Sequence, residues 1–239
     1  MSAGAQTPPP DPAPPASLAV VVTARVPFPA GIPAVIDPAD RAAVARLGRL
    51  FAAGQADLYT QDEADLALLP TLTRTWMPRG EQLKVKAPGT NEKRSVSTAT
   101  DLADGTLLWQ TDDKRCAVQF CATIRLCVDR STARGRFAVL LVDNAPSHRV
   151  GKTGIVRTAL DELAGRVILV FLPPYSPDLA PAERLWRQWR PNVTHNHTRS
   201  TLAELEADSD RWLTTMAAEP RTVLQALALP ITQPNRKAA

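Results

Sequence analysis

The chain has 239 residues, of which 44% are hydrophobic and 22% charged, with a net charge of +4 and a pI near 9.2. Such a length and composition fit one sizeable α/β domain with extensions, or two small domains. The mild positive charge is compatible with a nucleic-acid partner without requiring one. No apolar run reaches the ~18 residues of a transmembrane helix, and the start lacks the features of a signal peptide. We therefore expect a cytoplasmic protein without a membrane partner.

The first 54 residues are predicted to contribute little to a core. Residues 1–17 form a proline-rich tail that we expect to be disordered. Residues 18–54 are interpreted as a remnant N-terminal or linker region. Its first half is interrupted by prolines and has no assigned structure, whereas its second half predicts a helix over 37–53, with Asp37 as the N-cap and Pro38 in the first turn.

The next segments predict strands. The sequence QADLYTQDE reads as a strand that begins after Gly54 and ends at acidic residues. Residues 72–86 are expected to form two antiparallel strands around a turn at 78–80. Residues 94–110 give the clearest hairpin signal, because alternating residues flank an Asp104-Gly105 turn.

Helices and strands then alternate. The pattern predicts helices at 114–130, 155–163 and 181–190, strands at 137–142 and 167–172, and one or two more helices within 200–229. Antiparallel strands followed by alternating helices and parallel strands indicate an α/β protein with a mixed sheet flanked by helices. This is the element order of the ribonuclease H-like fold, here with a C-terminal helical extension over 196–239.

The three cysteines lie within one predicted helix. Cys116, Cys121 and Cys127 are odd in number and contain no CxxC pair, which argues against a disulfide framework and a zinc site. Apolar residues recur around them at helical spacing. We therefore expect buried thiols that pack as small hydrophobic groups.

Three acidic positions follow predicted strands or open the helix after one. Asp143 directly follows the apolar strand 137–142, and Glu183 lies in the first turn of a helix, where the helix dipole favours a carboxylate. Asp62 and Glu63 end the earlier strand, and alternation alone does not decide which of them faces the end of the sheet. Each has a simpler explanation, since Asp143 could form a turn and Glu183 could pair with Arg187.

Together these acids indicate a metal site. Mg²⁺ prefers carboxylate oxygens, and two ions held by acids from separate segments can activate water or a 3′-hydroxyl for cleavage of a polynucleotide. Asn144 and His148, which follow Asp143 in the sequence DNAPSH, are possible auxiliary residues. His148 could orient a phosphate or a water, although a histidine beside a turn is more often a surface hydrogen-bonding residue.

The motifs LVDNAPSH and FLPPYSPDLAPAERLW closely resemble the catalytic core of mariner-type transposases and their bacterial insertion-sequence relatives, the DDE superfamily. LYTQDEADLALLPTLTRTWMPRGEQ resembles the first catalytic block of that family. The resemblance runs from about residue 55 to 189 and implies Asp62, Asp143 and Glu183 as the catalytic metal ligands. It also implies Mg²⁺ or Mn²⁺ as the cofactor, with two ions. Asp178 has a familiar spacing from Asp143, but the third acid of the family is the one in the x-Pro-x-Glu segment.

The resemblance implies a DDE catalytic domain over 55–195 that cleaves DNA and transfers strands at element ends. The implied partners are double-stranded DNA, both terminal inverted repeats and target DNA, and a second copy in a homodimer on that DNA. In a bacterium such a protein would be associated with the nucleoid. Basic residues beside the predicted hairpins are candidate phosphate contacts, namely Lys84, Lys86, Lys93 and Arg94.

Two departures from the family support an alternative reading. Where relatives have Asn-Pro-Ile-Glu, this chain has Ala180-Pro181-Ala182-Glu183, and the loss of an Asn cap costs about 1 kcal/mol. No helix-turn-helix pattern precedes the predicted core, from which we expect an N-terminally truncated transposase. The alternative is a catalytically inactive DNA-binding or dimerising remnant.

Overall fold

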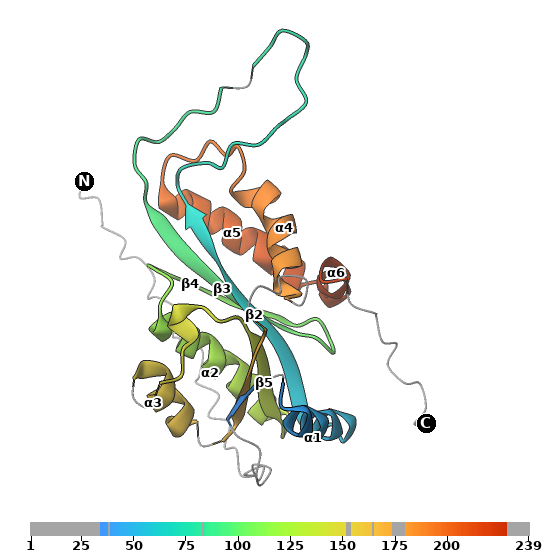
Figure 1. Ribbon diagram of the computed structural model, residues 1–239. Coiled ribbons are helices and arrows are strands. Elements are labelled where there is room, and N and C mark those ends of the chain that lie inside the picture. Colours follow the sequence, from blue (N-terminus) through green and yellow to red (C-terminus); the bar gives the residue numbers. More distant parts are fainter. Residues whose placement is uncertain are drawn as a thin grey trace, which may run out of the picture.

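The computed structural model describes residues 34–37, 39–82, 84–151, 154–163, 165–173 and 180–228 (Figure 1). The proline-rich tail, most of the predicted linker region and Asp178 lie outside these ranges. Within them, no helix is both long enough and apolar enough to cross a membrane.

A six-stranded mixed sheet organises the protein, with the strand order β1-β6-β5-β2-β3-β4. Strands β1, β6, β5 and β2 run parallel, whereas β3 and β4 continue the sheet as an antiparallel hairpin. The strands are β1 (Val35–Ile36), β2 (Ala56–Ala67), β3 (Lys93–Asp101), β4 (Leu107–Asp112), β5 (Phe137–Val142) and β6 (Val167–Phe171). The mixed α/β sheet and the hairpin predicted from the sequence are confirmed.

Helices cover both faces of this sheet (Figure 1). The helices are α1 (Arg41–Ala52), α2 (Ala117–Ala133), α3 (Ile155–Glu162), α4 (Ala182–Val193), α5 (Leu202–Ala217) and α6 (Pro220–Ala226), and a short 3₁₀ helix, η1 (Pro146–His148), follows β5. Helices α2 and α3 pack on one face. The other face carries α1 at one end and α4, α5 and α6 at the other.

The long strand β2 divides its side chains between these two layers. Tyr59 faces the core under α2 and α3, whereas Ala64 and Leu66 face the core formed by α4, α5 and α6. Successive side chains of a strand point to opposite faces, so neighbouring residues enter different environments. This alternation determines what the acidic residues at 62 and 63 can contact.

The helix expected over 37–53 begins later, at Arg41. Its N-cap is Asp40, whose carboxylate accepts a hydrogen bond from the Ala43 backbone N–H at 3.0 Å. Asp37 instead accepts from the Ala39 N–H in the turn before the helix. The prediction that Asp37 is the N-cap was wrong, because Asp40 fills that role one turn later.

The strands expected over 72–86 are absent from the described residues of that segment, which form part of a long loop between β2 and β3 (residues 68–92, the β2–β3 loop). The loop extends away from the body of the protein at the top of Figure 1. The expected turn is present, since the Glu81 N–H donates to the Pro78 carbonyl at 3.1 Å and Gly80 adopts a φ of 93°. A turn depends on local residues, whereas strands need a partner along their whole length.

The predicted cysteine helix is α2, and the burial of its thiols is confirmed for two of the three. Cys121 and Cys127 are buried, and burial raises the pKa of both thiols. Cys116 is the half-buried N-cap residue of α2. None of the three is in a disulfide.

The C-terminal helices pack tightly on the β3–β4 hairpin. Gly105 in the hairpin turn has a φ of 77°, and a Cβ atom there would lie 2.1 Å from the Pro220 carbonyl oxygen at the start of α6. Glycine is required here both by the left-handed backbone and by the close approach of α6.

We expect Gly105→Ala to lower the free energy of unfolding by about 3 kcal/mol or more, because it adds a backbone clash to the strain of a left-handed alanine. Gly135→Ala is the matched control. Gly135 has a φ of 68° with open space around it, so its substitution should cost only about 1–2 kcal/mol. Urea unfolding of both variants measures the difference, and equal costs would contradict the packing of α6 on the hairpin.

Candidate active site

The register of two parallel strands brings two of the predicted acids side by side. In the β2–β5 pair, Thr60 lies opposite Leu141. Asp62 and Asp143 are each two positions further along the sequence, so Asp62 lies on β2 beside the point where β5 ends and Asp143 follows. The prediction that this strand, β2, ends at the acidic residues was wrong, because β2 continues to Ala67 in its pairing with β3. The negative charge of Asp143 contributes to raising the pKa of Asp62.

Asp62 points toward the layer that contains α4. Its Oδ2 accepts a hydrogen bond from the Trp186 indole N–H at 3.1 Å, and its Oδ1 accepts from the Glu63 backbone N–H at 2.8 Å. Burial raises the pKa of Asp62 to about 6, and the negative charges of Glu63 and Asp143 add to this effect. Directly opposite on β3, the buried Thr98 hydroxyl has no hydrogen-bond partner. A half-buried carboxylate with a raised pKa, opposite an unpaired buried hydroxyl, is an environment that a bound cation would stabilise.

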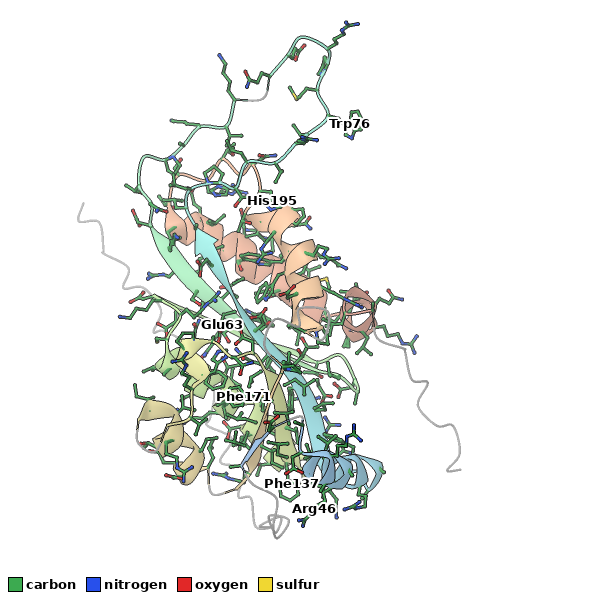
Figure 2. The ribbon with its side chains drawn as sticks, in the orientation of Figure 1. Arg46, Glu63, Trp76, Phe137, Phe171 and His195 are labelled. Atoms are coloured by element: carbon green, nitrogen blue, oxygen red, sulfur yellow. The ribbon has the colours of Figure 1, made fainter. Side chains whose placement is uncertain are left out.

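Glu63 points to the opposite face, near the centre of the molecule (Figure 2). Its Oε1 lies 2.9 Å from Nε2 of His148 and accepts a hydrogen bond from Gln61 at 2.7 Å. The Glu63 side chain is almost fully buried among these groups. Strand alternation therefore gives Asp62 and Glu63 different partners, which the sequence pattern left open.

Asp143 begins the turn after β5 and is half exposed. Its Oδ1 lies 2.7 Å from Nδ1 of His148 and accepts a hydrogen bond from the Ala145 backbone N–H at 2.9 Å. The hydrogen bond from His148 is the main reason why the pKa of Asp143 lies below its usual range. Asp143 is thus an ionised carboxylate at neutral pH, as a metal ligand must be.

Histidine 148 is completely buried and stacks on Phe120, with the ring centroids 4.1 Å apart. Because its side chain is not exposed, His148 cannot contact a phosphate directly in the way that the sequence had suggested. Burial alone would lower the pKa of His148, but hydrogen bonds to Asp143 and Glu63 outweigh it and raise the pKa to about 9. The imidazole therefore carries protons on both nitrogens and donates to a carboxylate on each side.

Glu183 lies in the first turn of α4, as predicted, and is exposed to solvent. Trp186, the partner of Asp62, follows it by three residues on the same helix, so one side of α4 faces Asp62. The N-cap of α4 is Pro181, which supplies no side-chain cap, and Ala182 is buried. Among the residues that the structure describes, no three acids, histidines or cysteines converge closely enough to hold a metal ion.

The remaining auxiliary candidate, Asn144, fixes the loop after β6 by donating from its side chain to the Leu172 carbonyl at 2.5 Å. Sequence reasoning missed the part that Trp186 takes in the site. The sequence shows that Trp186 follows Glu183 by three residues, which places both on one side of a helix. A tryptophan in an apolar helix stripe is normally a core residue, so this spacing did not indicate a role in the site. Trp186 is also a core residue here, and only its indole N–H reaches the site.

A second feature that sequence reasoning missed joins the β2–β3 loop to the end of α4. Asn196 adopts a φ of 48°, which asparagine tolerates better than most residues. Its side chain accepts from the Thr73 N–H and donates to the Thr73 carbonyl, at 3.0 and 3.1 Å. Backbone hydrogen bonds between Thr71 and residues 194 and 196 complete the attachment. The base of the loop is therefore held against the helix that carries Glu183.

This strand order, with one acid within β2, a second just after the adjoining parallel strand β5 and a third on a helix over the same sheet, defines an α/β protein of the ribonuclease H-like class. The family described as DDE superfamily endonuclease matches residues 57–206, which is more than half of the chain. The chain belongs to that family.

Individual relatives agree with this assignment. The chain is 26% identical, over 163 residues, to the insertion element IS630 uncharacterized 39 kDa protein of Shigella sonnei, covering 68% of this chain and 46% of the relative. Its fold is similar to the Mos1 mariner paired-end complex with Mn, at 17% identity and a TM-score of 0.54, covering 77% of this chain and 55% of the other. The Mos1 transposase paired-end complex with the left transposon end gives 18% identity and a TM-score of 0.52. The chain spans about half the length of these proteins.

Proposed function

We propose that this chain is the catalytic domain of a transposase that cleaves DNA at the ends of an element and transfers the resulting strands. The observation that carries the proposal is the placement of Asp62 on β2 and Asp143 just after the adjoining parallel strand β5, with α4 joined to Asp62 through Trp186. Membership of the DDE superfamily endonuclease family supports the reaction class. The similar Mos1 structures include paired-end complexes with Mn and with Mg.

In this proposal Asp62, Asp143 and Glu183 hold two Mg²⁺ or Mn²⁺ ions. Bound ions of this kind lower the pKa of water or of a 3′-hydroxyl and stabilise the leaving oxygen during phosphoryl transfer. The donors suit such ions, because all three are carboxylates and Asp62 lies beside an unpaired buried hydroxyl. In such a site the positive charge of the ions would offset the repulsion between the three carboxylates.

We propose that the phosphate backbone of the DNA contacts exposed basic residues of the β2–β3 loop and of the start of β3. Lys84, Lys86 and Lys93 are exposed and available to phosphates. Arg94 is a weaker candidate than the sequence indicated, because it pairs with Asp113 and lies 3.6 Å from Glu206. An enzyme with this substrate would work beside the nucleoid in a bacterial cell.

The homodimer is proposed to use the same loop. Trp76 is fully exposed on its extended part (Figure 2), and Leu72 is 72% exposed. We propose that these exposed apolar side chains form a surface that another molecule covers. A second copy bound to the same DNA would supply that surface.

The experiment is a nicking assay on duplex DNA that carries the terminal inverted repeats of the element. We expect cleavage by the full 239-residue chain in Mn²⁺ or Mg²⁺ and none in EDTA or in Ca²⁺, whose larger and more flexible coordination does not match the geometry that Mg²⁺ demands. The same chain should shift the mobility of this DNA in Ca²⁺. Binding without cleavage in any divalent metal would instead support an inactive DNA-binding remnant.

A further inference from the structure

A network of hydrogen-bonded side chains links β2 to the turn after β5, on the face of the sheet opposite Trp186. It runs from Gln61 through Glu63 and His148 to Asp143. Its three links measure 2.7 Å between Gln61 Nε2 and Glu63 Oε1, 2.9 Å between Glu63 Oε1 and His148 Nε2, and 2.7 Å between His148 Nδ1 and Asp143 Oδ1.

The geometry requires each imidazole nitrogen to act as a donor, because carboxylate oxygens are acceptors only. Glu63 and His148 expose 2% and 0% of their side chains, respectively. Stacking on Phe120 fixes the plane of the ring. Since His148 is rigidly placed from both sides, it fixes the position of the oxygen that it contacts.

Asp143 needs such support, because it lies beyond the last residue of β5 in an exposed turn. Both hydrogen bonds to its side chain, from Ala145 and from His148, go to Oδ1. This arrangement leaves Oδ2 for a ligand outside the network. The Ala145 N–H and the imidazole together therefore set the rotation of the carboxylate.

Glu63 is not itself placed to bind the same ion as Asp62. Adjacent residues on a strand point to opposite faces, and Glu63 is engaged by Gln61 and His148 on the α2 side. Arg115 lies 3.9 Å from its second oxygen and donates to its backbone carbonyl at 2.9 Å. The negative charge of Glu63 is thus balanced within the protein.

We propose that Glu63 and His148 are positioning residues that hold the Asp143 carboxylate beside Asp62 in the orientation needed for metal binding. This inference rests on the proposed function, because it assigns the two residues to the metal site proposed above. The two adjacent acids of β2 would then have different roles. Asp62 would bind the metal, and Glu63 would hold the second ligand, Asp143, in position through His148.

The test compares Glu63→Gln and His148→Asn with the unaltered chain. Glu63→Gln keeps the size of the side chain but removes the charge that holds the imidazolium. His148→Asn places an amide donor near the position of Nδ1 and should preserve part of the contact with Asp143, which His148→Ala should not. Mn²⁺ binding to the full chain, followed by electron paramagnetic resonance of the free ion, is measured together with the Mn²⁺ dependence of DNA nicking.

We expect Glu63→Gln and His148→Ala to raise the Mn²⁺ concentration for half-maximal binding about tenfold or more, with His148→Asn in between. Tyr59→Phe is the control for stability alone. It removes a buried hydroxyl of β2 that is hydrogen-bonded to Ser131 on the same α2 side of the sheet. It should lower the melting temperature without changing Mn²⁺ binding.

The outcomes separate this inference from the proposed function. If the unaltered chain nicks DNA and the Glu63 and His148 variants need no more Mn²⁺ than it does, the inference is wrong and the function stands. If the unaltered chain binds Mn²⁺ without nicking DNA, and the variants weaken that binding, the function is wrong and the positioning role stands. Absence of Mn²⁺ binding by the unaltered chain overturns both.

Discussion

Replacing Asp143 by asparagine should abolish Mn²⁺-dependent nicking of terminal-repeat DNA and leave the fold intact. The change keeps the shape of the side chain but removes the negative charge that a divalent ion requires. Charge stabilisation by a bound metal contributes several kcal/mol to phosphoryl transfer, so we expect a loss of about three orders of magnitude in rate. Initial rates with supercoiled substrate, with circular dichroism as a check of folding, provide the measurement.

Asp161→Asn is the matched control for the change in charge. Asp161 lies on α3 and pairs with Arg157 one turn away, and both side chains are largely exposed. Its replacement should leave the nicking rate within about twofold, since exposed pairs contribute little. Nicking by Asp143→Asn at the rate of the control would remove Asp143 from the site and, with it, the proposed mechanism.

The second large effect is expected at an ion-pair network around Asp101, which pairs in the sheet with Tyr59 near the start of β2. The Asp101 side chain is fully buried, and its Oδ2 lies 2.6 Å from Arg130 and 3.1 Å from Arg134, both at the C-terminal end of α2. Arg130 also contacts Asp104 at 2.6 Å. This network ties the β3–β4 hairpin to α2 and neutralises a carboxylate that has no contact with water.

We expect Arg130→Met to lower the free energy of unfolding by about 3 kcal/mol, because it leaves Asp101 buried with one weaker partner. Arg125→Met on the same helix is the control. Arg125 pairs with Glu162 at 2.9 Å, but both side chains are exposed, so its loss should cost less than about 1 kcal/mol. Urea unfolding of the two variants tests the difference, and similar costs would mean that the network contributes no more than a surface pair.

Much of the fold was predictable from residue patterns that act locally. The strand 137–142 was predicted with its observed bounds, because six consecutive apolar residues between polar ones favour a strand buried on both faces. The β3–β4 hairpin followed from Asp104-Gly105, whose φ preferences determine the turn. Helix α5 lies within the predicted helical range 200–229, and a capping box at Thr201 and Glu204 opens it.

Predictions that depended on distant partners were less reliable. The turn at 78–80 led us to predict strands over 72–86, but the turn forms within a loop, and at the base of that loop Thr73 bonds to Asn196. The choice between Asp37 and Asp40 as the cap of α1 was decided by where the helix joins the core through Ala43 and Leu47. Neither contact can be read from the local sequence.

For the candidate site, the sequence by itself determined the chemistry that is available: carboxylates on or just after two strands and on a helix, in the order of the DDE superfamily. Their assignment as metal ligands stays a prediction. Only the tertiary structure decided which way each acid points. Strand alternation separates Asp62 from Glu63 by face, but Trp186 and His148, distant in sequence, determine what each face contains. A hydrogen bond depends on distance and direction in space, and those are set when the helices pack on the sheet.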